Sequence, residues 1–211
     1  MGDAALTRAL ALHCMQVTGG FQIGVDDNLP RPDGSLLLIS PSEPMFWPHF
    51  SQSSEYMDKA PDPLDRWSRR IGDKLARDFG AVALYPFGGP PYQPFYTWAL
   101  RTGRAWASPT GFLVHDMGGL FISYRMALQV PWQSNVSKSA RPCESCAKPC
   151  ATACPVDAFA SGYNGAACKA HLHSPTGQDC MTKGCAARRA CPVGQGNRLA
   201  AQAAFHMEDF L

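Results

Sequence analysis

Eight cysteines are crowded into one short segment of the chain. The 211-residue sequence contains nine cysteines, and only Cys14 precedes residue 143. The other eight are Cys143, Cys146, Cys150, Cys154, Cys168, Cys180, Cys185 and Cys191. In a reducing compartment a dense cysteine cluster more often binds metal than forms disulfides. The sequence therefore predicts eight metal-ligating thiols, with Cys14 as a buried structural thiol.

The spacing of the first four of these cysteines indicates the kind of metal. They form the pattern C-x2-C-x3-C-x3-C-P, which ends at Pro155 and is one residue longer in its middle gap than the bacterial ferredoxin run. In two-cluster ferredoxins, three thiolates of such a run bind one cluster and the fourth reaches the neighbouring cluster. A second Cys-Pro step, Cys191-Pro192, closes the region. Eight cysteines satisfy two four-cysteine clusters, so the pattern predicts two [4Fe–4S] clusters.

The competing interpretation is a pair of zinc sites with four thiolates each, in a non-enzymatic binding module. Zinc sites usually present paired C-x2-C knuckles, but only Cys143 and Cys146 form one here. The zinc interpretation also leaves both Cys-Pro steps unexplained. His171 and His173 flank Cys168 and are candidate ligands, but eight cysteines already suffice, which favours a role outside the metal shell.

Composition and charge exclude several other classes of protein. Hydrophobic residues make up 45% of the chain and charged residues 17%, which excludes a disordered chain and a coiled coil. The formal net charge of +2 gives no reason to expect a nucleic-acid partner. The N-terminus lacks the features of a signal peptide, and no segment is apolar enough to span a membrane. We therefore expect a cytoplasmic protein with no membrane association; the sequence leaves its oligomeric state open.

Around this segment, the pattern predicts an α+β protein with two domains. Residues 1–136 resemble a mixed α/β domain, and residues 137–211 form a ferredoxin-like domain with a C-terminal helix over 197–211. A loop rich in glycine and proline is expected at 87–95. Helices are expected at 4–16, 62–80 and 95–103, and strands at 35–40, 81–85, 111–115 and 119–125.

The helix over 62–80 is the best-defined of these elements. Asp62 is placed to cap it, Pro63 suits its first turn and Gly80 can end it. An apolar face is predicted from spacings of three and four, comprising Leu64, Trp67, Ile71, Leu75 and Phe79.

The order of these segments resembles a known group of enzymes. An α/β part is followed by WASPTGFLVHDMGGLFISYRMAL (106–128), the run CESCAKPCATACP, an isolated Cys168 and GCAARRACPVG (184–194). This order is similar to the epoxyqueuosine reductase and reductive dehalogenase group. The resemblance implies a nitroreductase-like domain that binds cobalamin, followed by a dicluster ferredoxin module.

The resemblance also implies a division of the cysteines between two clusters. One cluster would be held by Cys143, Cys146, Cys150 and Cys191, and the other by Cys154, Cys168, Cys180 and Cys185. The last motif departs from the reductase pattern, because five residues without a cysteine separate Cys185 from Cys191. Cys180 must then supply a ligand from outside that motif. The glycine-lysine-asparagine signature of the reductases is also absent, so the resemblance does not extend to their substrates.

No catalytic residue can be named from the sequence, but three groups of side chains are candidates for a pocket. The first is the loop 87–95 with Trp98, which can approach a flat corrinoid or flavin or can simply pack on the sheet. The second and third comprise His115, Asp116, Tyr124 and Arg125, and Asp65, Arg66 and Arg69.

The predicted function is transfer of single electrons. The clusters either feed a reductase site in the N-terminal domain, acting on a small-molecule substrate, or relay electrons to a redox partner protein. Basic side chains in the cysteine region could offset cluster charge, dock that partner or be ordinary surface charge; they are Lys148, Lys169, Lys183, Arg188 and Arg189.

Overall fold

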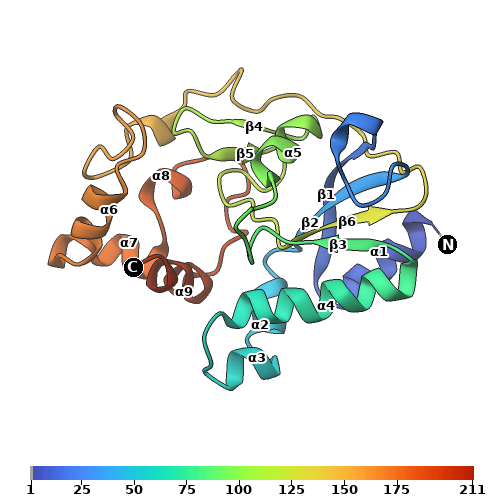
Figure 1. Cartoon of the computed structure of the whole chain (residues 1–211). Helices are drawn as coiled ribbons and strands as arrows, with labels where there is room; N and C mark the ends of the chain where they lie inside the picture. Colours follow the sequence, from blue (N-terminus) through green and yellow to red (C-terminus); the bar gives the residue numbers. More distant parts are fainter. Residues whose placement is uncertain (1) are drawn as a thin grey trace. The chain divides into compact units, whose positions relative to one another are not determined.

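The computed structural model describes residues 2–211 and contains two compact units (Figure 1). The first unit comprises the residues up to Arg104 together with Ser123–Ser139. The second comprises Ala105–Ile122 together with Ala140–Leu211. The prediction of a fold that mixes helices and strands is confirmed. Among residues 2–211, no helix has the length and apolar character needed to cross a lipid bilayer.

The boundary between the units differs from the expected division after residue 136. Residues 105–122 lie early in the chain but pack with the cysteine segment rather than with the first unit. Apolar packing explains this, since Val114 and Leu120 are buried in one cluster with Cys150 and Cys191. The second unit is therefore assembled from two separate stretches of chain.

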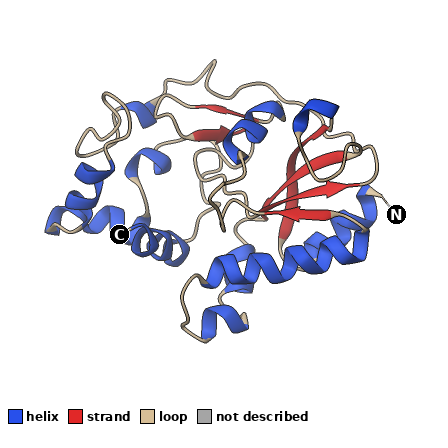
Figure 2. Ribbon diagram, in the orientation of Figure 1, coloured by secondary structure: helices blue, strands red, loops and turns tan. Residues whose placement is uncertain are grey.

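The first unit is built on a four-stranded antiparallel sheet with the order β1-β2-β6-β3 (Figure 2). Its two central strands are buried along their whole length, which is why they contain continuous runs of mostly apolar residues. The strands are β1 (Met15–Gln22), β2 (Ser35–Pro41), β3 (Val82–Leu84) and β6 (Met126–Val130).

Helix α4 (Pro63–Phe79) packs against strands β3 and β6 of this sheet. All five residues of the predicted apolar face are buried, which confirms the amphipathic pattern. The helix starts after Asp62 and ends before Gly80, as predicted, although the Asp62 side chain makes no capping hydrogen bond. The smaller helices are α1 (Asp3–Ala11), η1 (Val25–Asp27), α2 (Phe46–Phe50), α3 (Ser54–Met57) and α5 (Phe95–Arg101).

Two of the predicted elements are wrong in extent or position. The helix expected over 4–16 ends at Ala11, because the chain turns at Cys14, whose φ is 49°, and enters strand β1. The strand expected over 119–125 is irregular apart from one bridge between His115 and Gly119. The strand of the central sheet begins instead at Met126, where pairing with both β2 and β3 becomes available.

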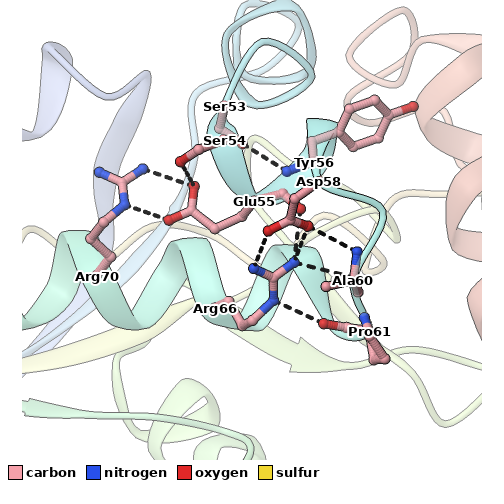
Figure 3. Close-up of polar contacts among 9 residues, drawn as sticks. All are labelled: Ser53, Ser54, Glu55, Tyr56, Asp58, Ala60, Pro61, Arg66 and Arg70. Carbon is pink, nitrogen blue, oxygen red and sulfur yellow. Dashed lines mark hydrogen bonds and ion pairs between the residues drawn. The ribbon is translucent and has the colours of Figure 1, made fainter.

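A partly buried ion pair joins helix α3 to helix α4 (Figure 3). The Arg70 guanidinium donates to both carboxylate oxygens of Glu55, with Nη2 at 3.0 Å from Oε2, and the Ser54 hydroxyl donates to the same oxygen at 3.2 Å. The hydrogen bond from Arg70 lowers the pKa of Glu55 from about 4.5 to about 2, despite the opposing effect of burial. Beside this pair, Arg66 donates to both oxygens of Asp58.

We expect Glu55 to make the first unit sensitive to acid. A depressed folded-state pKa contributes stability that is present above about pH 4.5 and is lost as the pH falls towards 2. Glu55→Gln should therefore lower the free energy of unfolding by up to about 3 kcal/mol at pH 7, and by much less at pH 3, since Arg70 is half exposed and partly screened. Denaturant unfolding followed by tryptophan fluorescence measures both values.

Asp78→Asn provides the matched control, because Asp78 forms an exposed pair with Lys74 on the same helix. This variant should change the free energy of unfolding by less than about 0.5 kcal/mol at either pH. Equal losses in the two variants, or a loss in Glu55→Gln that does not vary with pH, would contradict the role given to Glu55.

The second unit consists of short helices and one small sheet. Strands β4 (Ala105–Ala107) and β5 (Leu113–His115) pair in antiparallel fashion, with Trp106 opposite Val114. The α-helices, labelled in Figure 1, are α6 (Gly165–Leu172), α7 (Gln178–Lys183), α8 (Ala186–Arg189) and α9 (Ala200–Phe210). Two short 3-10 helices are η2 (Pro149–Ala151) and η3 (Pro175–Gly177). The predicted C-terminal helix is thus confirmed as α9, which packs against α7.

Candidate metal centre

The β4–β5 sheet and the turn after it form one wall of the candidate site. His115 at the end of β5 is fully buried, and its Nδ1 accepts backbone N–H groups of Met117 and Gly118 at 3.1 and 3.2 Å. These contacts, with the Asp116 carboxylate 2.9 Å from the same nitrogen, show that His115 holds the turn. This turn places Gly119 next to Cys191 and Val193, at the end of the cysteine segment. Leu120, the next residue, is buried.

Four of the predicted ligands converge on this wall, and we call Cys143, Cys146, Cys150 and Cys191 the first cysteine set. Cys150 on η2 and Cys191 after α8 are buried in one apolar cluster with Val114 and Leu120, and Cys143 packs against it. Helix α8 and η2 also pack together, which explains how Cys191 reaches the other three.

The thiols of the first set are close enough to influence one another's ionisation. Burial raises the pKa of Cys143, and the neighbouring Cys146 and Cys191 raise it further against the charge of Arg141. Burial likewise raises the pKa of Cys150, with added contributions from Cys191, Cys143 and Cys146. A bound metal relieves this cost, because it replaces the proton on each thiol.

The remaining ligands, Cys154, Cys168, Cys180 and Cys185, are called the second cysteine set. Cys168 lies on α6, Cys180 is buried on α7, and Cys185 precedes the first turn of α8. Burial raises the pKa of Cys185, and nearby Cys180 adds to this. Cys154 is fixed separately in the preceding turn, where its sulfur accepts the N–H of Ala158 at 3.3 Å.

Sequence reasoning named Arg188 among the basic residues of this region but missed the aromatic side chains of Phe112 and Tyr163 beside it. Burial raises the pKa of Tyr163, and the neighbouring Cys168 and Cys185 raise it further. The Arg188 guanidinium lies over the Phe112 ring, 4.6 Å from its centroid, and the Phe112 and Tyr163 rings are 5.3 Å apart. Burial lowers the pKa of Arg188. Because Tyr163 lies in an irregular segment, no periodicity marked it out.

The other basic residues of this region have different surroundings. Lys183 and Arg189 both pair with Asp179, and Lys169 lies over Phe210 and donates to the carbonyl of Leu211 at 3.1 Å. Lys148 is exposed beside the first set.

The arrangement of the thiols bears on the kind of metal. Among residues 2–211, no three His, Cys, Asp or Glu side chains are grouped so as to hold a metal ion. A single zinc ion draws its thiolates to within about 2.3 Å of one centre. A four-iron cluster binds one thiolate at each of four irons, so its ligands stand farther apart. These requirements differ, so the metal content of the protein distinguishes the two interpretations.

The candidate pocket residues of the first unit are only partly brought together. Asp65 and Ser68 both bind the guanidinium of Arg125. Arg69 lies over the rings of Tyr85 and Phe87, at 4.8 and 5.3 Å from their centroids. Phe87 begins the glycine- and proline-rich loop, which is irregular as predicted.

The other pocket candidates lie elsewhere. Trp98 is buried on α5 beside Phe95, and Arg66 binds Asp58 and neighbouring carbonyls. His115 and Asp116 belong to the second unit, whereas Tyr124 and Arg125 belong to the first, so the structure does not define these four as one pocket.

Fold and site together define an α/β protein with a cysteine-rich second unit, and solved structures with similar folds are known. No family model and no curated protein sequence matches the chain. Epoxyqueuosine reductase from Bacillus subtilis superposes with a TM-score of 0.54 and 16% identity, covering 93% of this chain and 66% of the reductase. The chain thus spans about two thirds of the reductase length.

Two further structures have similar folds. An epoxyqueuosine reductase solved with a tRNA-Tyr stem loop gives a TM-score of 0.51, 14% identity and coverage of 93% of this chain and 66% of the reductase. The B12-trafficking protein CblC from C. elegans gives a TM-score of 0.51 and 13% identity, and the match covers 99% of this chain and 96% of CblC. These similarities establish the fold that the chain shares with both kinds of protein.

Proposed function

We propose that the protein is an iron–sulfur electron carrier, with one [4Fe–4S] cluster on each cysteine set. The observation that carries the proposal is the convergence of Cys191 with Cys143, Cys146 and Cys150. The two-cluster ferredoxin pattern requires a cysteine distant in sequence to complete the ligands of one cluster. The structural similarity to epoxyqueuosine reductase supports a redox role.

The residues around each set supply what such a cluster needs from a protein. Thiolates bind iron, and backbone N–H groups donate to sulfur, as Lys148 does to Cys146 at 3.2 Å. Val114 and Leu120 exclude water from Cys150 and Cys191. When bound, a [4Fe–4S] cluster accepts or releases single electrons, and the protein sets its potential through charge, hydrogen bonds and exposure.

Anaerobic metal analysis tests the proposal. We expect the protein, purified without oxygen, to be brown, to absorb broadly across the visible range and to contain about eight irons per chain. A colourless protein containing two zinc ions would overturn the proposal in favour of the zinc-stabilised binding module.

The first unit is the proposed electron acceptor, with cobalamin as the bound group. Support comes from the fold shared with the B12-trafficking protein over nearly the whole of both chains. In the first unit, the glycine- and proline-rich loop contains Phe87 and the exposed Tyr92, with Arg69 over Phe87. These aromatic and cationic groups fit a large flat ligand with polar edges. A cobalamin held there would supply a redox-active metal to a reductase site.

Adding cobalamin to the iron-loaded protein distinguishes this reductase from a simple relay. We expect a saturable change in the absorbance spectrum of cobalamin when the protein is added. Tyr92→Ala should weaken this binding. The flavin FMN, added in the same way, should show no change in its own spectrum. If neither compound changes its spectrum or copurifies, the protein is a relay for a separate redox partner. Neither outcome changes the iron content, so the electron-carrier proposal is tested independently by the metal analysis.

A further inference from the structure

Arg69 is an exposed arginine of helix α4 that lies beside the glycine- and proline-rich loop of the first unit. The neighbouring Arg66 and Arg70 each donate to a carboxylate (Figure 3). In the described part of the chain, no carboxylate lies within ion-pair distance of Arg69, and its guanidinium donates no hydrogen bond. The positive charge and the N–H donors of Arg69 are therefore available to a ligand.

Two carboxylates on the same helix lie one turn from Arg69, but both are held by other groups. Asp65, four residues earlier, accepts from the guanidinium of Arg125. Asp73, four residues later, accepts from the hydroxyl of Tyr85 at 2.6 Å. Residues four apart on a helix are neighbours, so either carboxylate could otherwise pair with Arg69. The fold thus leaves this charge unpaired where helix neighbours would usually neutralise it.

Aromatic rings support the Arg69 guanidinium. The rings of Tyr85 and Phe87 stack with centroids 5.1 Å apart, and the guanidinium carbon lies 4.8 and 5.3 Å from those centroids. Gly72 gives Tyr85 room against the helix, since a Cβ there would lie 2.5 Å from the hydroxyl oxygen. A guanidinium donates in its own plane, so rings against its face leave its donors open.

The loop adds backbone donors beside this guanidinium. The N–H groups of Phe87, Gly88 and Gly89 donate no hydrogen bond to any residue that the structure describes. Gly88 has a φ of 84°, and a Cβ there would lie 3.1 Å from Nη2 of Arg69, so the guanidinium lies against the backbone at this glycine. Successive backbone N–H groups in turns form anion-binding concavities. Arg125, 5.8 Å from the Phe87 centroid, adds a second cation.

A phosphate group matches these donors. Arginine donates two parallel N–H bonds to phosphate oxygens, and a glycine lets the backbone approach a ligand closely. Donors from both the guanidinium and the loop suit the three oxygens of a phosphate better than the two of a carboxylate. We propose that Arg69 and the backbone of residues 87–89 bind the phosphate ester of a ligand held at this loop.

This site deepens the proposed function and rests on it, because cobalamin carries a phosphate ester in its nucleotide tail. FMN carries the same chemical group, so cobalamin and FMN are two sources of one chemistry. Two pairs of compounds that differ only by a phosphate separate them. They are cobinamide phosphate with cobinamide, a corrinoid that lacks the nucleotide tail, and FMN with riboflavin.

Binding of each compound to the iron-loaded protein is measured from the change in its own absorbance spectrum. We expect the wild-type protein to bind cobinamide phosphate about tenfold more tightly than cobinamide, the effect of one charge-assisted contact. Arg69→Met should reduce this preference to less than about twofold, by weakening only the binding of cobinamide phosphate. We expect neither FMN nor riboflavin to bind.

Arg77→Met is the matched control. Arg77 is exposed in the last turn of the same helix, so this variant removes the same charge from α4 at a distance from the loop. It should keep the full preference for the phosphate. The affinity for cobinamide shows directly whether the loop is still in place in Arg69→Met, because cobinamide has no phosphate to lose.

Four results would overturn the phosphate site. The first is equal binding of the two members of each pair by the wild-type protein, and the second is failure of all four compounds to bind. The third is an equal loss for cobinamide and cobinamide phosphate in Arg69→Met, which would mean that Arg69 only holds the loop. The fourth is loss of the preference in Arg77→Met as well.

These outcomes separate the phosphate site from the proposed function. Equal binding of the two corrinoids leaves cobalamin as the proposed group and removes only the phosphate site. A preference for FMN over riboflavin that Arg69→Met abolishes, with no corrinoid bound, keeps the phosphate site and replaces cobalamin by a flavin. Failure of all four compounds to bind removes both the phosphate site and cobalamin, and leaves the electron-carrier proposal to the iron analysis.

Discussion

Cys168→Ser is expected to lower the iron content of the anaerobically purified protein from about eight to about four per chain. Cys168 lies on α6, outside both Cys-Pro motifs, and belongs to the proposed ligands of the second set. Loss of this ligand leaves the first set complete, so a cluster should remain there. Iron and sulfide analysis, together with the visible absorbance, measures the loss.

Two further variants make this result specific. Cys191→Ser should remove the cluster on the first set and also leave about four irons. Cys14→Ser should retain all the iron, since Cys14 lies in the first unit, at the turn between α1 and β1. Full iron content in Cys168→Ser, or equal losses in Cys14→Ser, would contradict the assignment of the ligands.

Local signals in the sequence predicted the elements that they control directly. Helix α4 has a proline in its first turn, a glycine at its end and an apolar residue at every third or fourth position, and its limits were predicted to within a residue. Strand β6 (Met126–Val130) was misplaced to 119–125, although it is buried along its whole length like β2, which was predicted. Its position depends on pairing with β2 and β3, which lie far away in the sequence.

In the candidate site, too, some features could be predicted from the local sequence and others depend on the fold. The spacing of the cysteines predicted eight thiols as one set of metal ligands, and only the family resemblance implied how they divide between two clusters. The sequence did not single out Arg188 from Lys183 or Arg189, since only the fold places Phe112 beneath it and Asp179 beside the other two. The contribution of residues 105–122 to the second unit was likewise hidden, because those residues precede the cysteines by a long interval.

Gly119→Ala is expected to remove the cluster on the first cysteine set while leaving the second. Gly119 has a φ of 55°, and a Cβ there would lie 2.1 Å from the carbonyl oxygen of Val193 and 3.3 Å from the sulfur of Cys191. The left-handed conformation alone costs an alanine about 1–2 kcal/mol. The contact with Val193 involves backbone, so the chain at Cys191 must move, and we expect about four irons per chain.

Gly111→Ala separates that displacement from simple backbone strain. Gly111 also has a positive φ, of 79°, but a Cβ there would meet no atom within 4 Å. This variant should lower the melting temperature slightly, since it carries the conformational cost without the collision, and it should keep about eight irons. Equal iron contents in the two variants would show that the turn after β5 does not position Cys191. Loss of iron in Gly119→Ala alone would mean that this turn holds the most distant ligand of the first set in place.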